Sequence, residues 1–155
     1  MTELVHAVAL AVALDADGPL AGALLIGPSG AGKSALALHL IETCPHRRTA
    51  LVSDDAVLLD AASVRLRASA PQRIVGLVEV RGFGVAAVRT APAVDLLAGF
   101  ELSADAPRVP APLHKALAGS HLPVWPLVAR DPATAAIRLR VILRAILARN
   151  GAAED

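Results

Sequence analysis

The chain has 155 residues, about one domain's worth, and its formal net charge is +1 at pH 7. Hydrophobic residues make up 55% of it and charged residues 19%, a composition that excludes intrinsic disorder. The near-neutral charge and an aromatic content of only 2% also argue against a dedicated nucleic-acid binder, which usually displays basic side chains interleaved with aromatic ones.

The longest apolar run, Leu4–Leu14, is too short for a membrane-spanning helix, which needs roughly 20 residues. The N-terminus also lacks the cationic segment and the cleavage pattern of a signal peptide. We therefore expect a soluble cytoplasmic protein with no membrane partner. The single cysteine, Cys44, cannot form an internal disulfide, and we interpret it as a small apolar residue near a helix end.

Apolar runs and turn residues predict an α/β order for the first two thirds of the chain. The run Leu4–Leu14 ends at turn residues 15–19, and a second apolar run, Leu20–Ile26, leads into a glycine-rich loop. Leucines at helical spacing predict a helix over Lys33–Cys44, which stops before Pro45. Short strands are predicted after it, the second and third as a hairpin, at residues 49–52, 56–59, 64–67, 76–80 and 85–88.

The last third of the chain is predicted to hold a loop, a strand and a helix. Prolines at 92, 107, 110 and 112 indicate that residues 91–112 are mostly loop. A strand over Leu122–Val128 follows, and then a long helix over Pro132–Arg149 with Asp131 as its N-cap. We see no internal repeat or linker, so we expect a single α/β domain with a mixed sheet over residues 1–155.

The loop between the second apolar run and the first helix fits the pattern G-x-x-x-x-G-K-[ST] at every fixed position. A chance match in this chain is on the order of one in a thousand. In this pattern the backbone N–H groups wrap a phosphate, the lysine reaches the β- and γ-phosphates, and the serine hydroxyl binds Mg²⁺. The predicted nucleotide-binding residues are Gly27, Pro28, Ser29, Gly30, Ala31, Gly32, Lys33 and Ser34.

Two further groups of residues are candidates for phosphoryl-transfer chemistry. Asp54 and Asp55 stand at the end of a short apolar strand, where one carboxylate can hold Mg²⁺ and the other can accept a proton. On spacing alone, a turn-forming pair of aspartates is an equal alternative. Glu79 and Arg81 lie two apart on a predicted strand and share a face, which is either part of an active site or an exposed ion pair.

Taken together, the segments GPSGAGKS, LVSDDAV and EVRGFGV resemble the catalytic domain of HPr kinase/phosphorylase. The resemblance runs from about His6 to the C-terminal helix. It implies a P-loop α/β domain akin to phosphoenolpyruvate carboxykinase, without the N-terminal domain of the full-length enzymes. It also implies an ATP-dependent serine kinase whose partner is HPr, a carrier protein of the sugar phosphotransferase system, and a role in regulating carbon and nitrogen metabolism.

The resemblance also implies roles for single residues. Lys33 corresponds to the P-loop lysine, and Asp55 to the residue that takes the serine proton. His6 corresponds to a histidine near the catalytic aspartate, and Arg108 to an active-site arginine. For Mg²⁺ the resemblance implies Ser34 and Glu79 as ligands, whereas Asp54 either assists the metal or orients Asp55.

The sequence departs from the family at two places, of which the first removes a carboxylate near the metal and the second bears on the reverse, phosphorylase reaction. Ala35 stands where many members have an acidic residue. Trp125 stands where full-length members carry an arginine of a Pro-Val-Arg-Pro-Gly-Arg loop, and Arg130 is the next arginine along the chain. Because tryptophan cannot make a guanidinium's bidentate phosphate contact, we expect a kinase with weak or no phosphorylase activity.

Two other functions and one possible interaction surface stay open at this point. A small-molecule P-loop kinase is one alternative, and a nucleotide-binding regulatory module without transferase activity is the other. The C-terminal helix alternates apolar residues with Arg138, Arg140, Arg144 and Arg149. It is either a packed helix with a solvated basic face or a docking surface for an acidic partner or a second subunit, and the resembled family is typically hexameric.

Overall fold

The computed structural model describes residues 1–62, 64–71, 76–105 and 113–154. Two helices are present among them, α1 (Lys33–Glu42) and α2 (Pro132–Glu154). The strands are β1 (Thr2–His6), β2 (Val8–Val12), β3 (Ala21–Ile26), β4 (Ala50–Ser53), β5 (Ala56–Asp60), β6 (Arg67–Ser69), β7 (Leu77–Val80), β8 (Gly84–Ala87), β9 (Ala93–Ser103), β10 (Leu113–Leu117) and β11 (Ser120–Val128).

In the described part of the chain, nine strands form one mixed sheet in which β9 is central. Its main path runs β1-β5-β6-β9-β3-β2-β4, and β11 also pairs with β9 and carries β10 at its edge. The pairs β3–β9 and β9–β11 are parallel, whereas β2 is antiparallel to both β3 and β4. The carboxyl ends of β3, β4, β9 and β11 therefore open at the same edge of the sheet.

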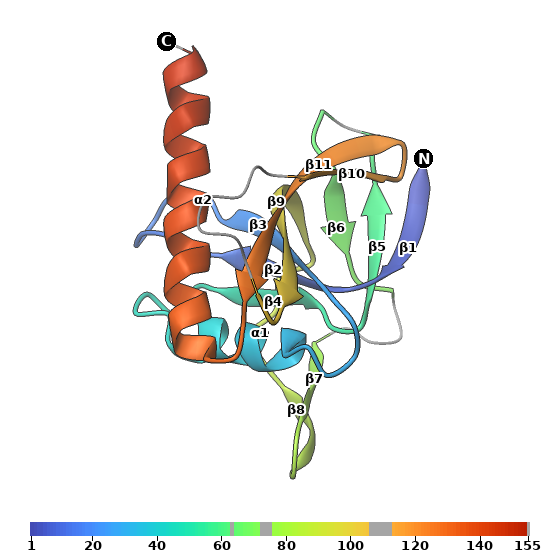
Figure 1. Ribbon diagram of the computed structural model, residues 1–155, viewed down its shortest axis with the longest axis vertical. Helices are drawn as coiled ribbons and strands as arrows, with labels where there is room; N and C mark the ends of the chain where they lie inside the picture. Colours follow the sequence, from blue (N-terminus) through green and yellow to red (C-terminus); the bar gives the residue numbers. More distant parts are fainter. Residues whose placement is uncertain (63, 72–75, 106–112, 155) are drawn as a thin grey trace.

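The core lies on both faces of β2, which explains why its sequence is apolar without alternation. Val8, Leu10 and Val12 pack in a cluster with side chains of α1 and α2. The intervening alanines of β2 belong to a second cluster with residues of β5, β6 and β10. Figure 1 shows the consequence: the two helices cover one side of the sheet, and the strands β1, β5 and β6 lie away from them.

Two predictions for the strands were wrong. Residues 91–112 were predicted as loop, yet Ala93–Ser103 is the central strand of the sheet. The prolines at 92 and 107 flank this strand and do not interrupt it, so they do not remove any of its ladder hydrogen bonds. The predicted apolar run Leu4–Leu14 is divided into β1 and β2, because the chain bends at Ala7 and pairs first with β5 and then with β3.

The strand β10 was not predicted from the sequence, whereas the remaining elements agree with the predictions in type, with small shifts of their bounds. The predicted hairpin of residues 56–59 and 64–67 is formed by β5 and β6, with Leu58 opposite Ser69. Cys44 is buried just beyond α1, as expected. Asp131 caps α2 by accepting a hydrogen bond from the Ala133 N–H at 3.1 Å and one from the Thr134 hydroxyl at 2.6 Å.

The basic face of α2 is smaller than the sequence suggests. Arg138, Arg144 and Arg149 are exposed. Arg140 instead packs against the end of α1, where its guanidinium donates hydrogen bonds to the Leu40 carbonyl at 3.2 Å and to the Thr43 hydroxyl at 3.1 Å. No helix in the part of the chain described here combines the length and the hydropathy needed to cross a membrane.

The close approach of β3 and β9 depends on Gly22, because a Cβ there would lie 2.2 Å from the Asp95 carbonyl oxygen. We expect Gly22→Ala to lower the free energy of unfolding by roughly 1–3 kcal/mol or more, since backbone atoms must move to admit the methyl group. The exposed helix residue Gly151 has no atom within 4 Å of an added Cβ, so Gly151→Ala is the matched control. Urea unfolding, followed by the fluorescence of Trp125, the single tryptophan, measures the free energy of unfolding of both variants. If Gly22→Ala is as stable as Gly151→Ala, the expectation is contradicted.

Candidate active site

The glycine-rich loop lies at the carboxyl end of β3 and leads directly into α1. Gly30 and Gly32 have φ values of 85° and 99°, in the left-handed region that favours glycine. Gly32 is also the N-cap of α1 and, having no side chain, leaves the first N–H groups of the helix without a side-chain cap. Such a helix start suits an anion, because the free N–H groups and the helix dipole both favour negative charge.

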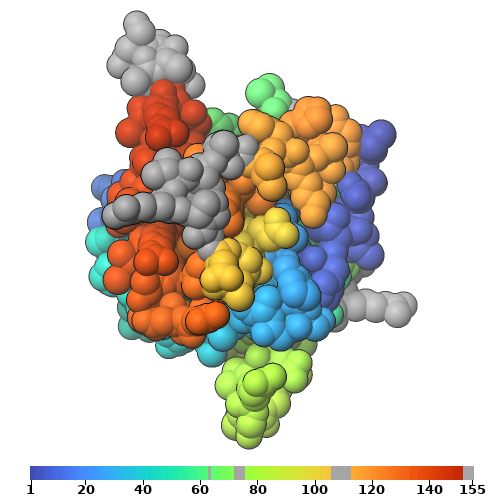
Figure 2. Space-filling model, in the orientation of Figure 1, coloured from blue at the N-terminus to red at the C-terminus, as the bar shows by residue number. Residues whose placement is uncertain are grey.

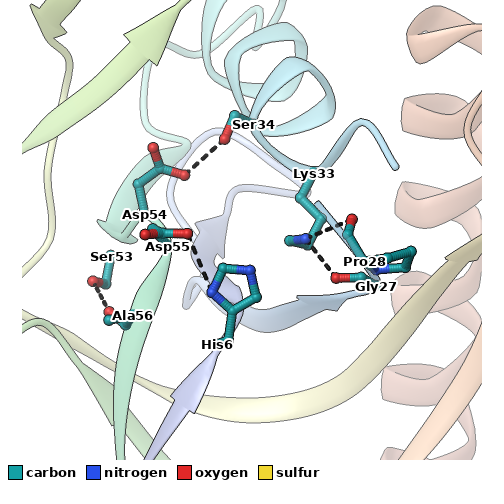
Figure 3. A network of polar contacts seen from close by, with 9 residues as sticks. All are labelled: His6, Gly27, Pro28, Lys33, Ser34, Ser53, Asp54, Asp55 and Ala56. Carbon is teal, nitrogen blue, oxygen red and sulfur yellow. Dashed lines mark hydrogen bonds and ion pairs between the residues drawn. The ribbon is translucent and has the colours of Figure 1, made fainter. Parts of the chain in front are cut away.

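Lys33 is the first residue of α1, and its side chain turns back over the loop (Figure 3). Its Nζ donates hydrogen bonds to the Gly27 carbonyl at 2.5 Å and to the Pro28 carbonyl at 3.1 Å. The residue is only 7% exposed. The loop therefore holds a nearly buried ammonium group across its own backbone, close to the N–H groups at the start of α1.

The two neighbouring aspartates after β4 point to different partners, as Figure 3 shows. The Ser34 hydroxyl donates a hydrogen bond to Asp54 Oδ1 at 2.9 Å, which links α1 to the end of β4. Asp55 Oδ1 lies 3.2 Å from His6 Nδ1. The strand ends here, so the carboxylates of two consecutive residues can both face one site.

The contact between His6 and Asp55 follows from the pairing of β1 with β5. His6 is the last residue of β1 and stands opposite Ala56, the first residue of β5, so that it lies beside Asp55. The backbone of Asp55 has a φ of 72°, which aspartate tolerates better than most residues. Both side chains are open to a ligand, at 53% exposure for His6 and 79% for Asp55.

His6, Lys33, Ser34, Asp54 and Asp55 all line one cleft of about 400 Å³. Glu79 at the end of β7 and Arg81 beyond it line the same cleft, although the sequence left open whether they form only an exposed ion pair. The hairpin β7–β8 that carries them stands out from the body of the molecule (Figure 2). The site residues predicted from the sequence that line the cleft are His6, Ser29, Gly30, Gly32, Lys33, Ser34, Asp54, Asp55 and Glu79.

Of the predicted loop residues, Gly27, Pro28 and Ala31 do not line this cleft. Arg108 lies outside the described residues. Of the loop residues, Pro28 and Ala31 line a separate groove on the other flank of the loop. That groove was not predicted, because two of its walls are built by residues 102–104, at the end of β9, and residues 129–130, just after β11, and the sequence did not place these two strands together.

The oxygen donors of the cleft suit Mg²⁺, a hard cation that prefers oxygen ligands. Ser34 and Asp54 are already in hydrogen-bond contact, and Glu79 lines the same space. Across the described ranges, no group of three or more His, Cys, Asp or Glu side chains is placed to hold a metal ion. Since Mg²⁺ usually keeps several water or phosphate ligands, the oxygen donors of Ser34, Asp54 and Glu79 fit this ion.

Comparison with known proteins places this geometry in a family. The family model for the HPr serine kinase C-terminal domain matches residues 2–94, which is more than half of the chain. The chain belongs to the HPr serine kinase family. The match includes β1 with His6, the glycine-rich loop, the aspartate pair and the β7–β8 hairpin, so the family and the cleft rest on the same residues.

Individual relatives agree with this membership. The HPr kinase/phosphorylase of Thermoanaerobacter sp. (strain X514) is 44% identical over 70 residues, which cover 44% of this chain and 22% of that protein. The HPr kinase/phosphorylase of Bordetella pertussis is 46% identical over 70 residues, covering 44% and 21%. The matched segments thus span about a fifth of the length of these relatives.

A solved structure resembles the fold over nearly the whole chain. The Hpr(Ser) kinase/phosphatase from Coxiella burnetii matches with a TM-score of 0.78 at 20% sequence identity. The match covers 98% of this chain and 94% of that one. The predicted mixed α/β fold is confirmed by this likeness, including the part of the chain beyond residue 94.

Proposed function

We propose that this chain is an ATP-dependent protein kinase that phosphorylates a serine of an HPr-like carrier protein in the cytoplasm, as a single P-loop domain akin to phosphoenolpyruvate carboxykinase. The observation that carries the proposal is the cleft in which Lys33, Asp54, Asp55 and His6 meet beside the glycine-rich loop. Membership of the HPr serine kinase family supports the proposed substrate class.

In the proposed reaction, the serine oxygen of the carrier attacks the γ-phosphorus of ATP, the bond from that phosphorus to the bridging oxygen breaks, and ADP leaves. The carboxylate of Asp55 accepts the proton of the attacking hydroxyl. His6, in contact with Asp55 Oδ1, orients that carboxylate. The protein forms no covalent bond to the phosphoryl group in this reaction, so the positioning of the reactants and electrostatic stabilisation account for most of the rate acceleration.

The loop and Lys33 are proposed to bind the phosphates. The N–H groups at the start of α1 and the nearly buried ammonium of Lys33 supply positive potential on the same side of the loop. Ser34 and Asp54 would hold Mg²⁺, with Glu79 as a further ligand from the hairpin. When bound, Mg²⁺ neutralises charge on the transferred phosphoryl group.

The architecture around the cleft supports a protein substrate more than a small molecule. Small-molecule P-loop kinases usually close an arginine-bearing helical lid over the acceptor. Within the described residues of 45–71, the chain forms β4, β5, β6 and turns, and no helix is present there. The resulting cleft is open, and both Asp55 and His6 remain exposed enough to be reached by a side chain of a folded protein.

The deciding experiment incubates the protein with γ-labelled ATP, Mg²⁺ and HPr-like carriers. Label on a serine of the carrier, lost when that serine is replaced by alanine, is the expected result. Label on a small metabolite from a cell extract would favour a small-molecule kinase. ATP binding without transfer to either acceptor would favour a nucleotide-binding regulatory module.

We further propose that the reverse, phosphorylase reaction is weak or absent. Trp125 is half-buried in β11 against the core and offers no guanidinium to a second phosphate. Arg130 lines the groove on the other flank of the loop and not the cleft. When phosphorylated carrier and inorganic phosphate are supplied without nucleotide, we expect little or no pyrophosphate. Pyrophosphate release as fast as the forward reaction would contradict this proposal and leave the kinase assignment standing.

A further inference from the structure

The glycine-rich loop separates two cavities. On one flank lies the cleft with the three carboxylates of Asp54, Asp55 and Glu79. On the other flank lies a groove of about 570 Å³, which shares loop residues with the cleft and is also lined by the end of β9 with Ala104, by the residues after β11 and by the start of α2. The loop and the start of α1 therefore contribute to two cavities of different chemistry, which share Ser29, Gly30, Gly32 and Ala35 in their linings.

The topology of the sheet places the groove at the carboxyl ends of three parallel strands. The strands β3, β9 and β11 run parallel, so that the loop after β3, residues 102–104 and residues 129–130 gather at the same edge. Ligands of open α/β sheets bind at the carboxyl ends of the parallel strands. The walls lie close to the loop: a Cβ on Gly27 would be 3.2 Å from the Leu102 carbonyl oxygen, and one on Gly32 would be 3.7 Å from that of Ala129.

The side chains of the groove differ from those of the cleft in a way that fits the two ends of a nucleoside triphosphate. Among the described residues that line the groove, none is acidic. Ala104, Ala129 and Pro132 offer apolar surface for a base, and Arg130 is the cationic side chain in the groove that could bind an α-phosphate or a ribose hydroxyl. The carboxylates that suit a metal and a proton transfer are confined to the cleft.

We propose that the nucleoside of the phosphate donor binds in this groove, between the carboxyl ends of β9 and β11, and that Arg130 is a binding residue there. The proposal rests on the proposed function, since it takes the glycine-rich loop to bind a nucleoside triphosphate. It fixes the direction of the bound ligand: the base lies toward α2, and the γ-phosphate lies toward Asp54 and Asp55.

The test compares two ligands that share the phosphates, ATP and inorganic tripolyphosphate, each with Mg²⁺, by titration calorimetry. Ala104 is exposed at the groove, so Ala104→Trp fills the groove without disturbing the core. We expect this variant to bind ATP at least about tenfold more weakly and tripolyphosphate within about twofold of the wild type. Ala16→Trp, at an exposed turn away from the groove, is the matched control and should change neither affinity.

Arg130→Ala is the second variant and does not depend on how the tryptophan is accommodated. We expect it to weaken ATP binding by about five- to tenfold, and tripolyphosphate binding much less. If ATP binds both variants as well as the wild type, the nucleoside lies elsewhere and the proposal is overturned, whereas the proposed kinase function stands. An equal loss of both ligands in Ala104→Trp and Arg130→Ala would put the phosphates themselves in the groove and also overturn it. Failure of the wild type to bind either ligand would instead remove the proposed function.

Discussion

We expect phosphoryl transfer to fall by on the order of 10³-fold when Lys33 is replaced by alanine, because the variant loses a nearly buried positive charge at the proposed phosphate-binding loop. The ammonium is held by the Gly27 and Pro28 carbonyls, and a charge so preorganised costs no rearrangement when the phosphoryl group moves. The measurement is the initial rate of transfer from labelled ATP to the carrier serine. Near-wild-type activity in this variant would mean that the glycine-rich loop does not bind the phosphates.

The variant must stay folded for that rate to be informative. Lys33→Ala leaves two loop carbonyls without their side-chain donor, which costs about 1–2 kcal/mol of stability if water replaces it only in part. Lys33→Met loses the same two hydrogen bonds but keeps most of the aliphatic stem, so it separates the loss of the charge from the loss of packing. Both should unfold in urea with a single transition of Trp125 fluorescence and should lose transfer to a similar extent.

The glycine-rich loop and the start of α2 could be predicted from the sequence because their chemistry is local. Consecutive residues supply the left-handed backbone at Gly30 and Gly32, and the cap of α2 joins Asp131 to residues only two and three positions away. Patterns of this kind are complete within one short window of sequence. The type of element and its bounds were accordingly predicted to within a few residues for α1 and for the start of α2.

Elements whose definition depends on distant partners could not be predicted in the same way. β9 is the central strand because β3, β6 and β11 pair with it. The sequence of residues 93–103 does not predict which strands will pair with it. The proline count over 91–112 favoured a loop, although Pro92 stands just before the strand. The groove beside the loop was missed for the same reason, since its walls lie at the carboxyl ends of β9 and β11.

The candidate site shows the same division. The sequence identified Asp54 and Asp55 as a pair but left a turn-forming role equally open, and it could not assign separate partners to the two carboxylates. The assignment comes from the register of β1 against β5, which brings His6 beside Asp55, and from the position of α1, which brings Ser34 to Asp54. Only the resemblance to a known family had pointed to His6.

The separate partners of the two aspartates lead to a prediction that distinguishes them. Asp55→Asn should lower transfer by about 10²–10⁴-fold, because an amide cannot accept the proton of the serine hydroxyl. ATP binding should stay within about threefold, since Asp55 faces His6 and not Ser34. Asparagine tolerates the left-handed backbone at this position, where φ is 72°, so the fold should be kept. The measurements are transfer rates at saturating carrier and ATP affinities by calorimetry.

Asp54→Asn is the variant to compare with Asp55→Asn. The Asp54 carboxylate accepts a hydrogen bond from the Ser34 hydroxyl and is the one proposed to hold Mg²⁺. We expect this variant to weaken the binding of ATP with Mg²⁺ by about tenfold or more and to recover part of its rate as Mg²⁺ is raised. Asp55→Asn should show no such recovery, because its defect is in accepting a proton. Asp17→Asn, in an exposed turn, should change neither property. Equal losses of nucleotide affinity in both variants would make Asp55 a metal ligand, and an unchanged rate in Asp55→Asn would reduce the pair to a turn between β4 and β5.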